Sequence, residues 1–112
     1  RSQLEAAAPQ LLHEKGEGRF RQRFEQFYPT FLPTLRNRLP NVTRNEELLC
    51  MLLALGQDTY QIEQLLSIAH RSVIMARHRL YKKVSAVSEQ SLEAFAQEIL
   101  DGCKQPETAT NN

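Results

Sequence analysis

One uninterrupted apolar run in the middle of the chain constrains its fold more than any other feature. The run covers residues 48–55, eight residues without a polar side chain. It is too short to cross a bilayer, which takes about 20 apolar residues in a helix. Thr43 precedes the run and Glu46 follows three residues later, which is the spacing of a capping box. Gly56 stands directly after the run and can adopt the left-handed conformation that ends a helix. We therefore predict a helix over residues 44–55 that is buried on nearly all sides.

The rest of the chain also has helical patterns, so we predict an all-α fold. No segment alternates apolar and polar residues in the way a half-buried strand does. Residues that start and stop helices separate the apolar stripes from one another. The predicted helices cover residues 19–27, 30–38, 44–55, 59–66, 70–84 and 89–101, with Ser88 as the N-cap of the last.

The charge of the chain is segregated, although its net value is only +1. Residues 64–88 contain five basic side chains and no carboxylate, so this stretch has a net charge of +5. Lys and Arg in such a surplus suit a polyanionic partner such as DNA, whose phosphates they neutralise. The alternative is a basic, solvated helix in an ordinary helical bundle.

The basic stretch coincides with a predicted helix-turn-helix. A short helix, a turn over residues 67–69 and a longer basic helix are the parts of that motif. On the longer helix, Val73, Leu80 and Val84 are predicted to face the core. The opposite face carries residues at spacings of three, four, seven and eleven: Arg71, Ile74, Met75, His78 and Lys82. An α-helix fits the major groove of DNA, so this face is a candidate recognition surface.

An aromatic stripe precedes this region. Phe20, Phe24, Phe27 and Phe31 recur at helical spacing, interrupted by Pro29. Such a stripe forms either a stacking surface for a ligand or base, or a packing surface against the following domain, and we favour packing. We divide the chain into residues 1–17 as a linker or the end of a preceding region, 18–41 as an aromatic helical extension, 42–101 as the helix-turn-helix domain with its C-terminal helix, and 102–112 as a disordered tail.

Several short motifs in register resemble the LuxR-type (NarL/FixJ, GerE-like) helix-turn-helix domain. They are VTRNE at 42–46, LLALG at 52–56, Ile62, LSI at 66–68, Val73, Arg77 and LYKKV at 80–84. The sequence around Phe27 and Phe31 is similar to the variant of this domain that follows tetratricopeptide or sensor regions in certain bacterial regulators. The resemblance implies a helix-turn-helix bundle, with a recognition helix over about 70–84, and the core match covers residues 42–84.

The same resemblance implies roles for the outward face of the recognition helix. Arg71 matches a position that approaches the DNA backbone, and Lys82 is placed to contact a phosphate or to complement the helix dipole. Ile74, Met75 and His78 match positions that face the groove, where apolar side chains touch thymine methyl groups and an imidazole donates to a base. The alternative for these three residues is packing against a partner protein.

Three positions depart from the family pattern or have a structural role. Glu63 replaces a small alanine and implies local repacking or an outward-pointing carboxylate. Ala69 replaces the usual serine N-cap of the recognition helix, which costs about 1 kcal/mol of helix stability. Arg77 is predicted to pair with Glu46 across the bundle and thereby orient the recognition helix, in preference to contacting a phosphate.

The most specific function these features predict is the DNA-binding output domain of a bacterial transcriptional regulator. The alternative is a helical protein-interaction module that kept the fold and lost DNA binding. We expect double-stranded DNA as partner, a cytoplasmic location without membrane contact, an upstream sensor region, and no enzymatic activity, cofactor or metal site. The three histidines and two cysteines lack the spacing of a zinc site.

The last predicted helix is a candidate for self-association. Its apolar stripe consists of Leu92, Phe95, Ile99 and Leu100. A homodimer through residues 89–101 would place two recognition helices on one duplex. The alternative is that the stripe folds back onto the aromatic extension of the same chain. Of the cysteines, Cys50 is predicted to be buried and Cys103 to be exposed, both as reduced thiols.

Overall fold

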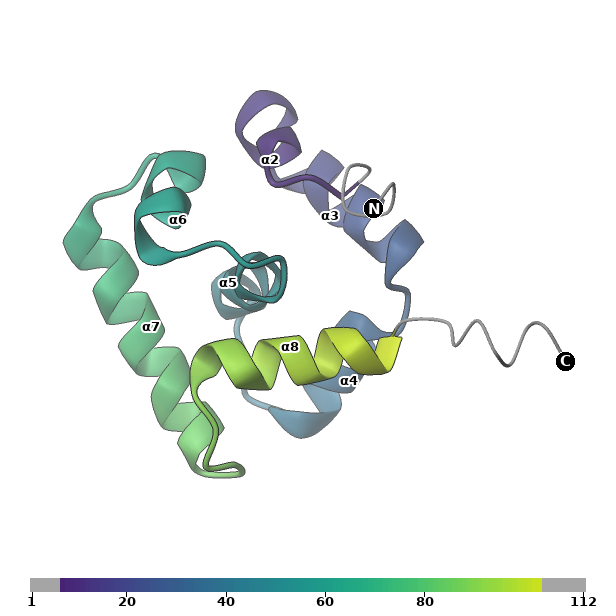
Figure 1. Cartoon of the computed structure of the whole chain (residues 1–112), viewed down its shortest axis with the longest axis vertical. Helices are drawn as coiled ribbons and strands as arrows, with labels where there is room; N and C mark the ends of the chain where they lie inside the picture. The colour runs from purple at the N-terminus through teal and green to yellow at the C-terminus, as the bar shows by residue number, and fades with distance from the viewer. Residues whose placement is uncertain (1–6, 104–112) are drawn as a thin grey trace, which may run out of the picture.

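Helix α5 (Arg44–Ala54) lies at the centre of the computed structural model, which describes residues 7–103 (Figure 1). Its capping box is confirmed: the Thr43 hydroxyl accepts from the Glu46 amide at 3.2 Å, and the Glu46 carboxylate accepts from the Thr43 amide at 2.9 Å. Gly56 ends the helix with φ of +84°, and its amide donates to the carbonyl of Leu53. As predicted, the apolar residues from Leu48 to Ala54 are buried.

Six further helices surround α5, and no strand occurs among residues 7–103. They are α2 (Gln10–Lys15), α3 (Glu17–Phe27), α4 (Phe31–Arg38), α6 (Thr59–Leu66), α7 (His70–Ser85) and α8 (Leu92–Cys103). In Figure 1, α5 is seen end-on in the middle, with α6 and α7 on one side and α8 across the front. The all-α class is therefore confirmed. Every helix in the described part of the chain is too short or too polar to span a bilayer.

The segment before residue 18 contains more structure than a linker. Residues 10–15 form α2, which packs against α3 and α6, and its Leu12 is buried. Gly16, with φ of +94°, lets α3 begin directly after α2 ends. Residues 1–6 of the expected linker lie outside the described residues.

The aromatic stripe packs inward. Phe20, Phe24 and Phe31 are fully buried, and Phe27 is partly buried against the same core. The Phe24 ring lies 5.0 Å from that of Phe31 in an edge-to-face arrangement, and 4.9 Å from that of Tyr28. Phe20, Phe24 and Phe31 have no exposed face for a ligand or a base to stack on, so the packing interpretation is confirmed.

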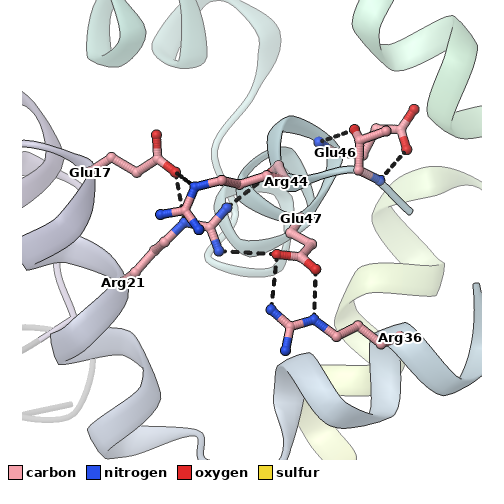
Figure 2. Close-up of polar contacts among 7 residues, drawn as sticks. Glu17, Arg21, Arg36, Arg44, Glu46 and Glu47 are labelled. Atoms are coloured by element: carbon pink, nitrogen blue, oxygen red, sulfur yellow. Dashed lines mark hydrogen bonds and ion pairs between the residues drawn. The ribbon is translucent and has the colours of Figure 1, made fainter. Parts of the chain in front are cut away.

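A buried carboxylate ties the aromatic extension to α5 (Figure 2). Glu47 accepts from Arg21 of α3 at 3.1 Å and, through both carboxylate oxygens, from Arg36 of α4 at 2.7 and 3.2 Å. Arg21 also donates to the Arg44 carbonyl at 2.6 Å and pairs with Glu17 at 2.7 Å. Burial alone raises the pKa of Glu47, but the hydrogen bonds from the two arginines outweigh it and hold that pKa below its ordinary value.

The last helix, α8, differs from its prediction in where it begins, in where it ends and in the burial of Cys103. It begins at Leu92 rather than at residue 89, because the Ser91 hydroxyl accepts from the Ala94 amide at 3.1 Å, whereas Ser88 bonds Gln90. It also extends to Cys103, which is buried rather than exposed and donates to the Ile99 carbonyl at 3.1 Å. Of the expected disordered tail, residues 102 and 103 belong to α8, and residues 104–112 lie outside the described part.

The apolar stripe of α8 is used within the chain. Its four members, Leu92, Phe95, Ile99 and Leu100, are all buried, and α8 packs against α5, α4 and α7. The core of the same chain therefore covers these side chains, as in the alternative in which the stripe folds back within one chain. A homodimer through residues 89–101 stays a prediction. Cys50 is buried as predicted, and that burial raises the pKa of its thiol to about 12.

Candidate nucleic-acid interface

Helices α6 and α7 are joined by the predicted three-residue turn. Helix α6 starts with a second capping box, in which Asp58 and Gln61 exchange hydrogen bonds of 2.8 Å. It ends at Leu66, where Ser67 takes the left-handed conformation with φ of +55° and reverses the chain direction. The order of short helix, three-residue turn and longer helix is the one the sequence predicts. A helix-turn-helix of the LuxR type stays a prediction.

The first residue of α7 is held by a side chain from α6. Ala69 occupies the N-cap position and, as expected of alanine, makes no side-chain cap bond. Glu63 contacts the imidazole of His70 across the turn. Glu63 therefore adds a contact between α6 and the start of α7, and its side chain stays partly exposed.

The two faces of α7 separate core from solvent as predicted. Val73, Leu80 and Val84 are buried. The five predicted recognition residues, Arg71, Ile74, Met75, His78 and Lys82, are all exposed together on the other face. Ile74 and Met75 are 44% and 48% exposed, so they add adjacent apolar surface to this face.

Two of the five cations on α7 are bound to carboxylates of the same chain. Arg77 pairs with Glu93 of α8 at 2.7 Å, and its Nη1 nitrogen is buried without an acceptor among residues 7–103. Lys83 pairs with Glu46 of α5 at 2.7 Å and donates to the Asn41 carbonyl at 2.6 Å. In both carboxylates burial raises the pKa, but the hydrogen bonds from the paired cation and from backbone amides lower it below the ordinary value.

The predicted pair between Arg77 and Glu46 is therefore wrong. Arg77 and Lys83 are six residues apart, and at about 100° per residue they emerge on opposite edges of the helix. Arg77 lies on the edge next to α8, whereas Lys83 lies on the edge next to the start of α5 and takes Glu46.

The other three cations of α7, Arg71, Arg79 and Lys82, have no carboxylate partner among the described residues. The sequence analysis missed Arg79 because it followed only one stripe of α7. Arg79 lies one turn before Lys83 and three residues before Lys82, so its helical position already placed it between the outward face and the α5 edge.

A hollow flanks α7 on each edge, and the two differ in charge. The hollow next to α5 has a volume of about 480 Å³ and is lined by Thr43, Asn45, Glu46, Ala76, Arg79, Lys82 and Lys83. The hollow next to α8 has a volume of about 310 Å³ and is lined by Ile74, Arg77, His78, Tyr81, Ser91, Leu92 and Glu93. The first therefore collects three cations against one carboxylate, whereas the second has one Arg–Glu pair and a histidine.

No family model matches the chain, and neither does any curated protein or solved structure. The exposed face of the 16-residue helix α7 and its charge are therefore the features that bear on function.

Proposed function

We propose that this chain is the DNA-binding output domain of a bacterial transcriptional regulator of the LuxR-type, with α7 as recognition helix in the major groove. One observation carries the proposal: the exposed face of α7 presents three cations, and no carboxylate among residues 7–103 pairs with them. An exposed helix of 16 residues is roughly 24 Å long, which is enough to lie along a major groove.

Each exposed residue has a role that suits this placement. Arg71 at the start of α7 and Lys82 near its end contact the phosphates on either side of the groove, which supplies affinity without sequence preference. Ile74 and Met75 lie between them and touch thymine methyl groups, while His78 donates a hydrogen bond to a purine N7 or O6. Sequence preference in this proposal comes from these three central side chains.

The two internal ion pairs of α7 support this function indirectly. Arg77 fixes one edge of the helix to α8, and Lys83 fixes the other edge to the start of α5. Because both edges of the helix are held before DNA arrives, the backbone of the presented face keeps one orientation on binding. We place such a regulator in the cytoplasm, where bacterial DNA lies.

The alternative, a protein-interaction module, is favoured by one specific observation. Ile74, Met75 and Tyr81 are all 44–48% exposed on the same helix, and exposed apolar groups are typical of protein interfaces. Both functions use α7, but only DNA binding requires the unpaired cations around these residues.

Binding of the chain to fragmented genomic DNA across a range of salt concentrations separates the two functions. DNA binding predicts an affinity that falls linearly on a log–log plot against salt, together with enrichment of a subset of fragments. Absence of binding at low salt would contradict the proposal and favour the protein-interaction module.

A further inference from the structure

We propose that the hollow between α7 and the start of α5 is a phosphodiester-binding site that seats one strand of the DNA backbone, whereas the α8 edge of α7 binds no phosphate. This inference rests on the proposed function and deepens it, because it states on which side of the recognition helix the backbone contacts are concentrated. The residues that bind are Arg79 and Lys82, and Arg79 is not among the positions implied by the family motifs.

The charge balance of this hollow favours an anion. Arg79, Lys82 and Lys83 line it, and Glu46 is the one carboxylate among its lining residues. The Glu46 carboxylate already accepts hydrogen bonds from Lys83 and from the Thr43 amide. After this pairing two full positive charges are left over in one hollow, and their side chains have no acceptor among residues 7–103.

The neighbouring acidic side chain does not cancel these charges. Glu17 lines an adjoining hollow together with Arg79. Its carboxylate is bound to Arg21 at 2.7 Å and to Arg44 at 3.2 Å, so it is already shared between two other arginines (Figure 2). Arg79 itself forms no ion pair with it, which leaves the guanidinium exposed for a ligand.

The shape and polarity of the hollow suit a chain of phosphates better than a small anion. The hollow is open and lies beside the exposed face of α7 that carries Met75 and His78, rather than inside the core. Thr43 and Asn45 at the start of α5 form its far wall with exposed hydroxyl and amide groups, which donate to phosphate oxygens. A backbone seated here runs alongside the recognition helix, as the wall of the major groove does.

The opposite edge of α7 lacks these properties. Arg77 is its one Lys or Arg side chain, and it is bound to Glu93. Arg77 and Glu93 neutralise each other, so this edge has no surplus positive charge for a phosphate, while Ile74 and Tyr81 add apolar surface. The duplex is therefore held mainly from the α5 side, and the α8 edge lies against a less charged part of the groove.

The test compares four single variants of the whole chain, Arg79→Gln, Lys82→Gln, Arg77→Gln and Arg19→Gln, by fluorescence anisotropy with a random-sequence DNA duplex. Arg79→Gln and Lys82→Gln each remove one phosphate contact, which lowers the magnitude of the log–log salt slope by about one and weakens binding about eightfold near 0.1 M salt. Arg19→Gln is the control, since Arg19 is an exposed arginine of α3 with no ion pair among the described residues, and it leaves both quantities unchanged. Thermal melting of all variants checks that the fold is intact.

The outcomes separate this inference from the proposed function. If the parent chain binds the duplex and Arg79→Gln behaves like Arg19→Gln, the α5-side site is wrong and the DNA-binding function stands. If Arg77→Gln lowers the salt slope as much as Arg79→Gln does, the backbone is contacted on both edges and the proposed asymmetry is wrong. If the parent itself does not bind at low salt, both proposals fall.

Discussion

Two groups of basic side chains in this molecule differ in what neutralises them. Around Glu47, Arg21 and Arg36 share one buried carboxylate and leave none of its oxygens free. On the outer face of α7, Arg71, Arg79 and Lys82 have no carboxylate partner among residues 7–103. The same residue types therefore stabilise the fold in one place and leave charge for a ligand in the other. The distribution of carboxylates, rather than that of the basic residues, distinguishes the two.

The largest expected effect is on stability, and it comes from removing the Glu47 carboxylate that Arg21 and Arg36 share. Glu47→Gln removes the negative charge between two arginines and leaves the guanidinium of Arg21, which is 7% exposed, with Glu17 as its remaining ionic partner. We expect the free energy of unfolding to fall by about 3 kcal/mol. Urea unfolding of the variant measures this loss. If the stability were unchanged, Glu47 would not be what holds α3 and α4 to α5.

Charge reversal at one of the three unpaired cations of α7 is expected to weaken DNA binding and to leave the stability of the fold unchanged. Arg71→Glu removes one phosphate contact and repels another, which weakens duplex binding about sixtyfold near 0.1 M salt. Because Arg71 is exposed, the melting temperature of the Arg71→Glu variant stays close to that of the parent chain. Anisotropy and thermal melting on the same sample measure both quantities. A large drop in melting temperature would show that the outer cations also stabilise the fold.

A variant in the middle of the recognition face sharpens the assignment of roles. His78→Ala is expected to change which fragments are enriched in a selection from random DNA, at a cost of about 1 kcal/mol for the preferred site. The salt slope stays that of the parent, because no phosphate contact is lost. An unchanged preference with a lower salt slope would place His78 on the backbone instead.

Substitutions at the two ends of α5 are expected to lower the free energy of unfolding by a smaller amount, and this loss is independent of charge. Gly56 has φ of +84°, and a Cβ added there would meet no atom within 4 Å. Gly56→Val therefore costs only the backbone strain of a β-branched residue, about 1–2 kcal/mol. Thr43→Ala, which removes the cap at the other end of α5, costs about 1 kcal/mol. Chemical unfolding ranks the two, and equal stability of Gly56→Val and the parent would refute the C-cap argument.

Acidification is expected to have the smallest effect on the free energy of unfolding, and it acts through the carboxylates of Glu46 and Glu47. Glu46 and Glu47 have folded-state pKa values below 4.5, so the folded state keeps them ionised where the unfolded chain takes up protons. Their contribution is fully present above about pH 5.5 and begins to be lost as the pH falls to about 4.5. It disappears as the pH falls further through the folded-state pKa. Urea unfolding at the two pH values should show a smaller loss for Glu47→Gln than for the parent.

Features encoded within a few residues could be predicted from the sequence. The capping box of Thr43 and Glu46, the C-cap at Gly56 and the two faces of α7 depend on spacings of three to thirteen residues, and all are confirmed. Their geometry is decided by the local backbone, so no distant part of the chain can alter them easily.

Partners that are distant along the chain could not be predicted in the same way. Arg77 was assigned to Glu46, but the edge of α7 on which each cation emerges depends on how α5 and α8 are placed around it. The same limit applies to α8, whose apolar stripe is equally compatible with a dimer or with the core of its own chain. Hydrophobic periodicity shows that a face is covered and does not show what covers it.

The contact of Arg21 with the Arg44 carbonyl has a mechanical consequence. Arg21 bonds the Arg44 carbonyl and Glu47 at the same time, so these hydrogen bonds fix the first turn of α5 to α3. Thr43 and Asn45 lie at the same end of α5, where they form one wall of the hollow beside α7. The ion pairs that stabilise the fold therefore also position one side of that hollow.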